Sequence, residues 1–111
     1  MGCNNRTYKT IRGDNFTINL INKDVDLSKY TKSTMTLRRT ADGELILTTS
    51  KNLGGELTTL SFSPTETQNL EGIYLLDLEL SDTGRQNVET LFVSDLYVVK
   101  DVSYQWALII L

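Results

Sequence analysis

Apolar and polar residues alternate with a period of two along most of this chain, and such alternation is typical of half-buried β-strands. The stretch FTINL places Phe16, Ile18 and Leu20 on one face and polar residues on the other. Residues 34–37 (TMTL) and 57–63 (LTTLSFS) repeat the alternation. No window of eleven or more residues carries a helical stripe, so the pattern predicts an all-β protein.

Three further stretches predict strands. Residues 44–50 (ELILTTS) follow Asp42-Gly43, a strong hairpin signal. Residues 88–100 form the longest extended stretch, and the alternation slips near Ser94-Asp95, which predicts a bulge or kink there. In residues 73–81 (IYLLDLELS) we expect every second side chain to face inward, namely Tyr74, Leu76, Leu78 and Leu80.

One short segment carries a helical signal. In SPTETQNL, Ser63 suits the N-cap, Pro64 suits the first turn, and Glu66 stands three residues after the cap. We predict one short helical turn near residues 64–70, ended by Gly72.

Short strands separated by turn signals predict a single domain with an antiparallel, immunoglobulin-like β-sandwich. We assign residues 1–6 to a flexible N-terminus, residues 7–103 to the sandwich, and residues 104–111 to an apolar C-terminal tail.

Charge and composition exclude several classes of function. The formal net charge is -3, the wrong sign for a protein that must neutralise nucleic-acid phosphates. Histidine is absent and Cys3 is the only cysteine, so no Ser-His-Asp triad, Cys-His pair or zinc site can be built. The apolar tail is far shorter than the roughly 20 residues of a membrane-spanning helix. We therefore expect no enzymatic activity, cofactor, metal, small-molecule substrate, nucleic-acid partner or membrane partner.

Two candidate motifs have simpler interpretations. The tripeptide Arg12-Gly13-Asp14 matches the motif that integrins recognise, but we interpret Gly13 as a turn residue and Asp14 as a local hydrogen-bonding group. Asp77 and Glu79 share one face of a predicted strand, where we expect them to be solvated rather than catalytic.

Aromatic residues suggest where a partner binds. Tyr74 and Tyr97 lie within predicted strands, and we expect them to pack in the core or at its rim. Tyr104 and Trp106 lie beyond the last predicted strand, and Trp106 begins a run of six apolar residues. Protein interfaces are enriched in such residues. The predicted partner-binding residues are Tyr104, Trp106, Ala107, Leu108, Ile109, Ile110 and Leu111.

Two arrangements of the tail remain open. If Trp106, Leu108 and Ile110 face one way, they form an apolar stripe that can add to the sheet edge of a neighbouring protein. Alternatively, the tail folds back as the last strand of its own sandwich. Even in the second arrangement Ala107, Ile109 and Leu111 face outward, which favours contact with another protein.

The order of motifs resembles a known module. The stretch YKTIRGDNFTINLINKDVDLSKYTKSTMTLRRTADGELI combines an RGDxF strand, a DLSKYT segment and an MTLRR strand. It is followed by LSFSPTETQNLEGIYLLDLELSDTGRQNVETLFVSDLYVVKDVS, which contains a strand of the type G-x-Y-x-x-D-x-E, a polar turn and a closing strand. From Tyr8 to Ser103 the chain resembles the immunoglobulin-like N-terminal domain of phage baseplate upper proteins and related phage tail and virion structural proteins.

This resemblance implies a virion structural protein that is synthesised in the host cytoplasm and works by protein–protein contacts. Its partners would be other phage virion proteins or copies of itself. Baseplate upper proteins continue beyond this domain, whereas this sequence ends eight residues after Ser103, so we expect a small accessory protein of a tail or baseplate, neck or capsid. The alternative function is a carbohydrate-binding or host-adhesion β-sandwich that uses exposed aromatic residues.

Overall fold

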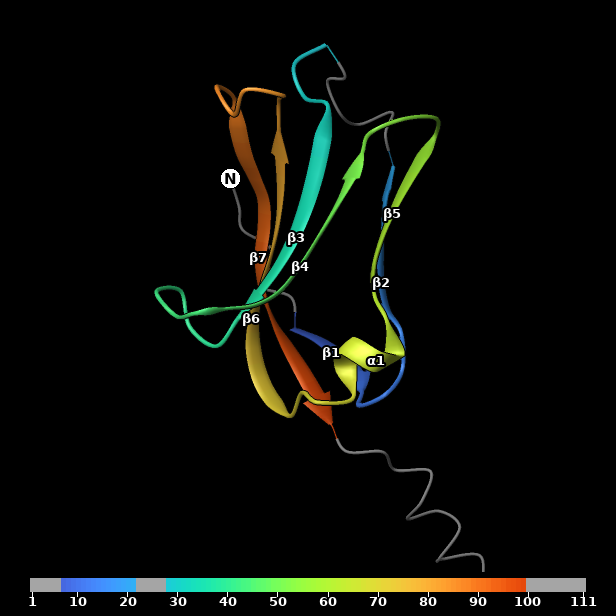
Figure 1. Cartoon of the computed structure of the whole chain (residues 1–111), viewed down its shortest axis with the longest axis vertical. Coiled ribbons are helices and arrows are strands. Elements are labelled where there is room, and N and C mark those ends of the chain that lie inside the picture. Colours follow the sequence, from blue (N-terminus) through green and yellow to red (C-terminus); the bar gives the residue numbers. More distant parts are fainter. Residues whose placement is uncertain (1–6, 22–27, 100–111) are drawn as a thin grey trace, which may run out of the picture.

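The computed structural model describes residues 7–21 and 28–99, which form two β-sheets packed face to face (Figure 1). The larger sheet has the strand order β1-β7-β6-β3-β4, and the smaller sheet pairs β2 with β5. The prediction of an all-β sandwich is confirmed. The elements are β1 (Thr7–Ile11), β2 (Phe16–Ile21), β3 (Lys32–Arg38), β4 (Leu45–Asn52), β5 (Leu57–Phe62), α1 (Pro64–Thr67), β6 (Gly72–Ser81) and β7 (Val88–Val99).

The core lies between the sheets and follows the predicted alternation. On β6, Tyr74, Leu76, Leu78 and Leu80 are all buried. On the opposite sheet, Phe16 of β2 pairs with Phe62 of β5, and both rings are buried. Because large apolar side chains from both sheets meet, their burial is the main stabilising contribution to the fold. The core cluster comprises Phe16, Met35, Leu37, Leu60, Phe62, Leu70, Tyr74, Leu76, Leu78, Leu96 and Val98.

Strand direction differs from the prediction at one place. β1 pairs with β7 in parallel, in a register that runs from Thr7 opposite Asp95 to Ile11 opposite Val99. The pairs β2–β5, β3–β4, β3–β6 and β6–β7 are antiparallel, as predicted. Alternation predicts which face of a strand is buried but carries no information on its direction. The short strand β1 was also not predicted.

The predicted bulge in β7 occurs at a different residue. Leu76 pairs with Ser94 and Leu75 with Asp95 in regular order, so the strand is not interrupted there. The register instead shifts between Leu78 and Glu79, which pair with Phe92 and Thr90. Leu91 is therefore the extra residue on β7.

The turn and helix signals are largely correct. The hairpin predicted at Asp42-Gly43 connects β3 to β4. The N-cap box is present, because the Ser63 side chain accepts a hydrogen bond from the Glu66 N–H and the Glu66 carboxylate accepts one from the Ser63 N–H. The helix ends at Thr67 rather than near residue 70, and Gly72 begins β6.

Candidate functional site

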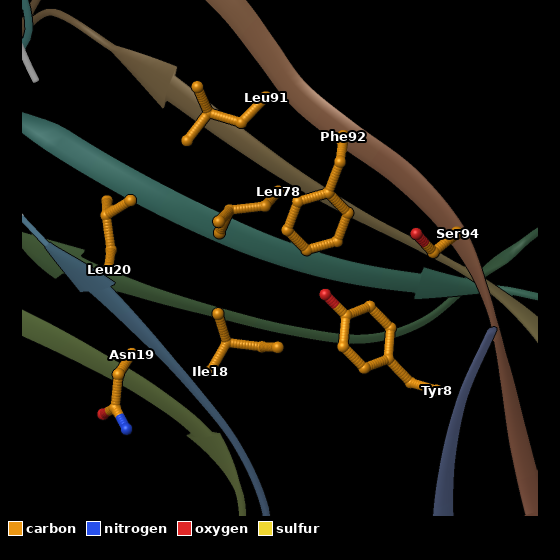
Figure 2. A pocket seen from close by; sticks show the side chains of 8 residues that line it. All are labelled: Tyr8, Ile18, Asn19, Leu20, Leu78, Leu91, Phe92 and Ser94. Carbon is orange, nitrogen blue, oxygen red and sulfur yellow. The ribbon is translucent and has the colours of Figure 1, made fainter. Parts of the chain in front are cut away.

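A cavity of about 250 Å³ opens between the two sheets beside β2 (Figure 2). The cavity is lined by three consecutive residues of β2, namely Ile18, Asn19 and Leu20. Because consecutive residues of a strand face opposite sides, the cavity extends along the edge of β2 as well as along its inner face. Within the described residues this edge pairs with no strand, because β5 occupies only the other side of β2. The complete lining is Tyr8, Ile18, Asn19, Leu20, Leu78, Leu91, Phe92 and Ser94.

The bulge in β7 shapes the mouth of this cavity. Leu91 has no partner on β6, and its side chain and that of the neighbouring Phe92 both line the cavity. In a regular strand, two consecutive side chains would point to opposite faces of the sheet. The bulge thus brings an additional apolar side chain to the opening, and Leu91 remains 37% exposed there.

Two hydroxyl groups introduce polarity into the cavity. Ser94 is 5% exposed, and its Oγ has no hydrogen-bond partner in the described part of the protein. The Tyr8 hydroxyl points into the space between Ile18 and Phe92 (Figure 2). The Tyr8 ring is held by edge-to-face packing on Phe16, with ring centroids 5.9 Å apart, and by contact with Phe92 at 5.8 Å. None of the lining side chains is charged, so the cavity suits an apolar group with one hydrogen-bonding atom.

A second candidate surface lies on the outer face of the larger sheet. We call it the outer-face patch, and it consists of Ile11, Ile73, Leu75, Tyr97 and Val99. Ile73 is opposite Tyr97 in the β6–β7 ladder, and the two side chains are 60% and 41% exposed. Such a pair is a typical core for a protein interface.

The exposure of Tyr97 corrects a prediction. We expected this ring in the core or at its rim, but it lies on the outer face, where Lys9 Nζ is 6.0 Å from the ring centroid. Leu96 and Val98 are buried, and strict alternation between them already directs Tyr97 outward. Tyr74 is buried as expected, with Arg39 stacked 4.1 Å from its ring centroid.

The Arg12-Gly13-Asp14 turn connects the two sheets. Gly13 has a φ of 91°, which favours glycine, and its N–H donates to Thr67 Oγ1 at 3.1 Å. The Asp14 N–H donates to the Ile11 carbonyl, and Arg12 forms a 3.4 Å ion pair with Glu71. These contacts agree with the interpretation of the tripeptide as a structural turn.

Asp77 and Glu79 also have structural partners. Asp77 accepts a hydrogen bond from the Thr36 hydroxyl across the β3–β6 ladder. Glu79 forms a 2.9 Å ion pair with Arg85. Each carboxylate is therefore held by a neighbour on the outer face of the sheet.

Two titratable groups have shifted pKa values at the end of the sandwich near residues 82–89. A hydrogen bond to the Glu89 carboxylate, together with burial, raises the pKa of Tyr30 above its usual value. Burial by itself raises the pKa of Asp82, but hydrogen bonds from the Asn87 side chain and the Gln86 N–H lower it below its usual value. Both groups stabilise local structure.

The predicted partner-binding residues 104–111 lie outside the described residues, as do residues 1–6, which we assigned to a flexible N-terminus. Over residues 7–21 and 28–99, no group of three or more His, Cys, Asp or Glu side chains is arranged to hold a metal ion. In the same residues, no helix is long and apolar enough to cross a membrane.

No family model matches this sequence, and no curated protein matches it significantly.

Proposed function

We propose that this chain is a structural protein of a bacteriophage virion: a small immunoglobulin-like assembly module of a tail or baseplate, neck or capsid. It works by contacts with other virion proteins or with copies of itself. The order of sequence motifs from Tyr8 to Ser103 supports the virion assignment. The observation that carries the mode of action is the outer-face patch.

The outer-face patch has the chemistry of a protein-binding surface. Ile73 and Tyr97 are adjacent on a sheet face, and Leu75 continues the apolar row along β6. Charged side chains border the patch. Lys9 pairs with Tyr97 across the β1–β7 ladder. Asp95 of β7 and Arg38 of β3 each pair with Leu75. Apolar and aromatic centres with charges at the margin are typical of the cores of protein interfaces.

Incorporation of variants into phage particles tests this proposal. Ile73→Asp places a charge at the most exposed position of the patch without removing a core side chain. We expect this variant to be soluble but depleted from purified particles. Val88→Asp is the control, because Val88 is also exposed, at 43%, but lies at the other end of β7. Equal incorporation of both variants at the wild-type level would contradict the role of the patch.

A carbohydrate-binding function has one supporting observation. Tyr97 presents an exposed ring on a sheet face, and aromatic rings of this kind stack on sugars. A glycan-binding screen with wild-type protein and Tyr97→Ala distinguishes the two functions. Binding of one glycan class by the wild type, lost in the variant, would favour the carbohydrate-binding function over assembly.

A further inference from the structure

We infer that the cavity between the two sheets is a binding site for a small, uncharged aromatic molecule that carries one hydrogen-bonding group. Three observations carry this inference: the volume of the cavity, its uncharged apolar lining, and the buried Ser94 hydroxyl, which has no partner in the described residues. The inference goes beyond the assembly function and does not rest on it.

The deepest polar atom of the cavity lacks a hydrogen-bond partner. Ser94 and Leu78 are the two lining residues that are fully buried, so they form the floor of the cavity. Buried hydroxyl groups in proteins are nearly always hydrogen-bonded, yet the Ser94 Oγ has no partner in the part of the chain that the structure describes. A ligand with one N–H or O–H group supplies this partner, because a serine oxygen can accept a hydrogen bond.

The walls of the cavity are apolar side chains that the described residues leave partly uncovered. Ile18 and Leu20 alternate with polar residues on β2 as Phe16 does, but they are only half-buried, whereas Phe16 is buried. Phe92 of β7 and Tyr8 of β1 are also half-buried. A ligand that covers these side chains removes apolar surface from water, which favours binding. Because two of the four are aromatic rings, the walls suit an aromatic ligand.

The aromatic walls are fixed without a ligand. The Tyr8 ring packs on Phe16 and on Phe92, with ring centroids 5.9 Å and 5.8 Å apart, and its hydroxyl points into the cavity (Figure 2). Phe92 is held in turn by its pairing with Leu78 across the β6–β7 ladder. A site that is already formed loses little conformational freedom when a ligand binds.

The volume and lining of the cavity set the size and charge of the ligand. An apolar cavity of roughly 150 Å³ accepts benzene. This cavity has about 250 Å³, so it suits a molecule somewhat larger than benzene, such as a fused two-ring compound. None of the lining side chains is charged, so a carboxylate or ammonium group would lose its hydration there without compensation. Indole meets all of these requirements, since it is a flat, uncharged two-ring compound with one N–H donor.

An NMR titration of the isotope-labelled, full-length protein with indole tests the site. We expect saturable chemical-shift changes at the amides of Ile18, Leu20, Phe92 and Ser94. Indene has the same two-ring shape without the N–H group. It should bind at the same residues but about fivefold more weakly, as expected for the loss of one hydrogen bond between uncharged groups.

Two serine variants test the role of the hydroxyl. Ser94→Ala removes the buried oxygen and keeps the apolar walls, so the affinity for indole should fall about fivefold while the affinity for indene does not fall. Ser81→Ala is the matched control, because the Ser81 Oγ is also buried without a partner in the described residues but does not line the cavity. It should leave the affinity for both compounds unchanged. The comparison of indole with indene on the wild-type protein depends on neither variant.

Three results would overturn the inference. The absence of saturable shift changes with both compounds, up to their solubility limits, would show that the cavity is not a binding site. Changes centred on Ile73 and Tyr97 would place binding on the outer-face patch instead. Equal affinities for indole and indene, or the same effect of the two serine substitutions, would show that the Ser94 hydroxyl does not recognise the ligand. None of these results bears on the assembly function, which incorporation into particles tests.

Discussion

Thr67 is a buried polar residue that links two distant parts of the chain. Its Oγ1 donates to the Asp14 carbonyl at 2.7 Å and accepts from the Gly13 N–H at 3.1 Å. Thr67→Val keeps the shape of the side chain but leaves both backbone groups without this partner. We expect the free energy of unfolding to fall by about 1–3 kcal/mol, as measured by urea denaturation.

The control for Thr67 lies in the same helix. Thr65 is exposed, so Thr65→Val should change the free energy of unfolding much less. An equal effect of the two substitutions would show that the hydrogen bonds of Thr67 do not stabilise the β1–β2 turn.

Asp82 makes stability depend on pH in the acid range. Its folded pKa is lowered, so its stabilising contribution is fully present above the unfolded pKa of about 3.9 and is lost as the pH falls through the folded value. In Asp82→Asn this contribution is absent, and we expect the melting temperature to fall less steeply below about pH 4. Parallel melting curves for wild type and variant across this range would contradict the assignment.

At the scale of the element, β6 separates a buried face from an outer one. Leu76 is fully buried, whereas the adjacent Leu75 is half-buried on the outer face. Leu76→Ala should lower the free energy of unfolding by about 2–5 kcal/mol, because it removes core contacts and leaves a cavity. We expect a clearly smaller loss for Leu75→Ala in the same chemical denaturation experiment. A larger loss for Leu75→Ala would mean that the two faces of β6 are assigned in the wrong order.

The sequence predicts the strand faces well and their connections less well. Phe16, Met35 and Leu60 alternate with polar neighbours, so their burial follows directly from the pattern. The parallel pairing of β1 with β7 depends on contacts between residues more than 80 positions apart, which no local pattern records. The bulge at Leu91 has the same origin, because it is defined by the partner strand β6.

The position of the cavity depends on how the strands are divided between the two sheets. Five strands pair in one sheet and two in the other within the described residues, so the cavity opens where β2 lacks a neighbour. The sequence identifies the apolar faces of β2 and β7. It does not show that the two sheets contain different numbers of strands, and therefore it does not predict the cavity. The outward orientation of the Tyr97 side chain, by contrast, could have been predicted from the alternation of apolar and polar positions around it. The predicted role of residues 104–111 in partner binding stays a prediction.

At the scale of the whole molecule, we propose that this protein works by presenting apolar surface to other polypeptides in a phage virion. Quantitative mass spectrometry of purified phage particles is the most direct test of this proposal. The account predicts that the protein co-purifies with the particles at a fixed ratio to their major structural proteins. Its absence from the particles, with all of the protein recovered in the soluble lysate, would contradict the account.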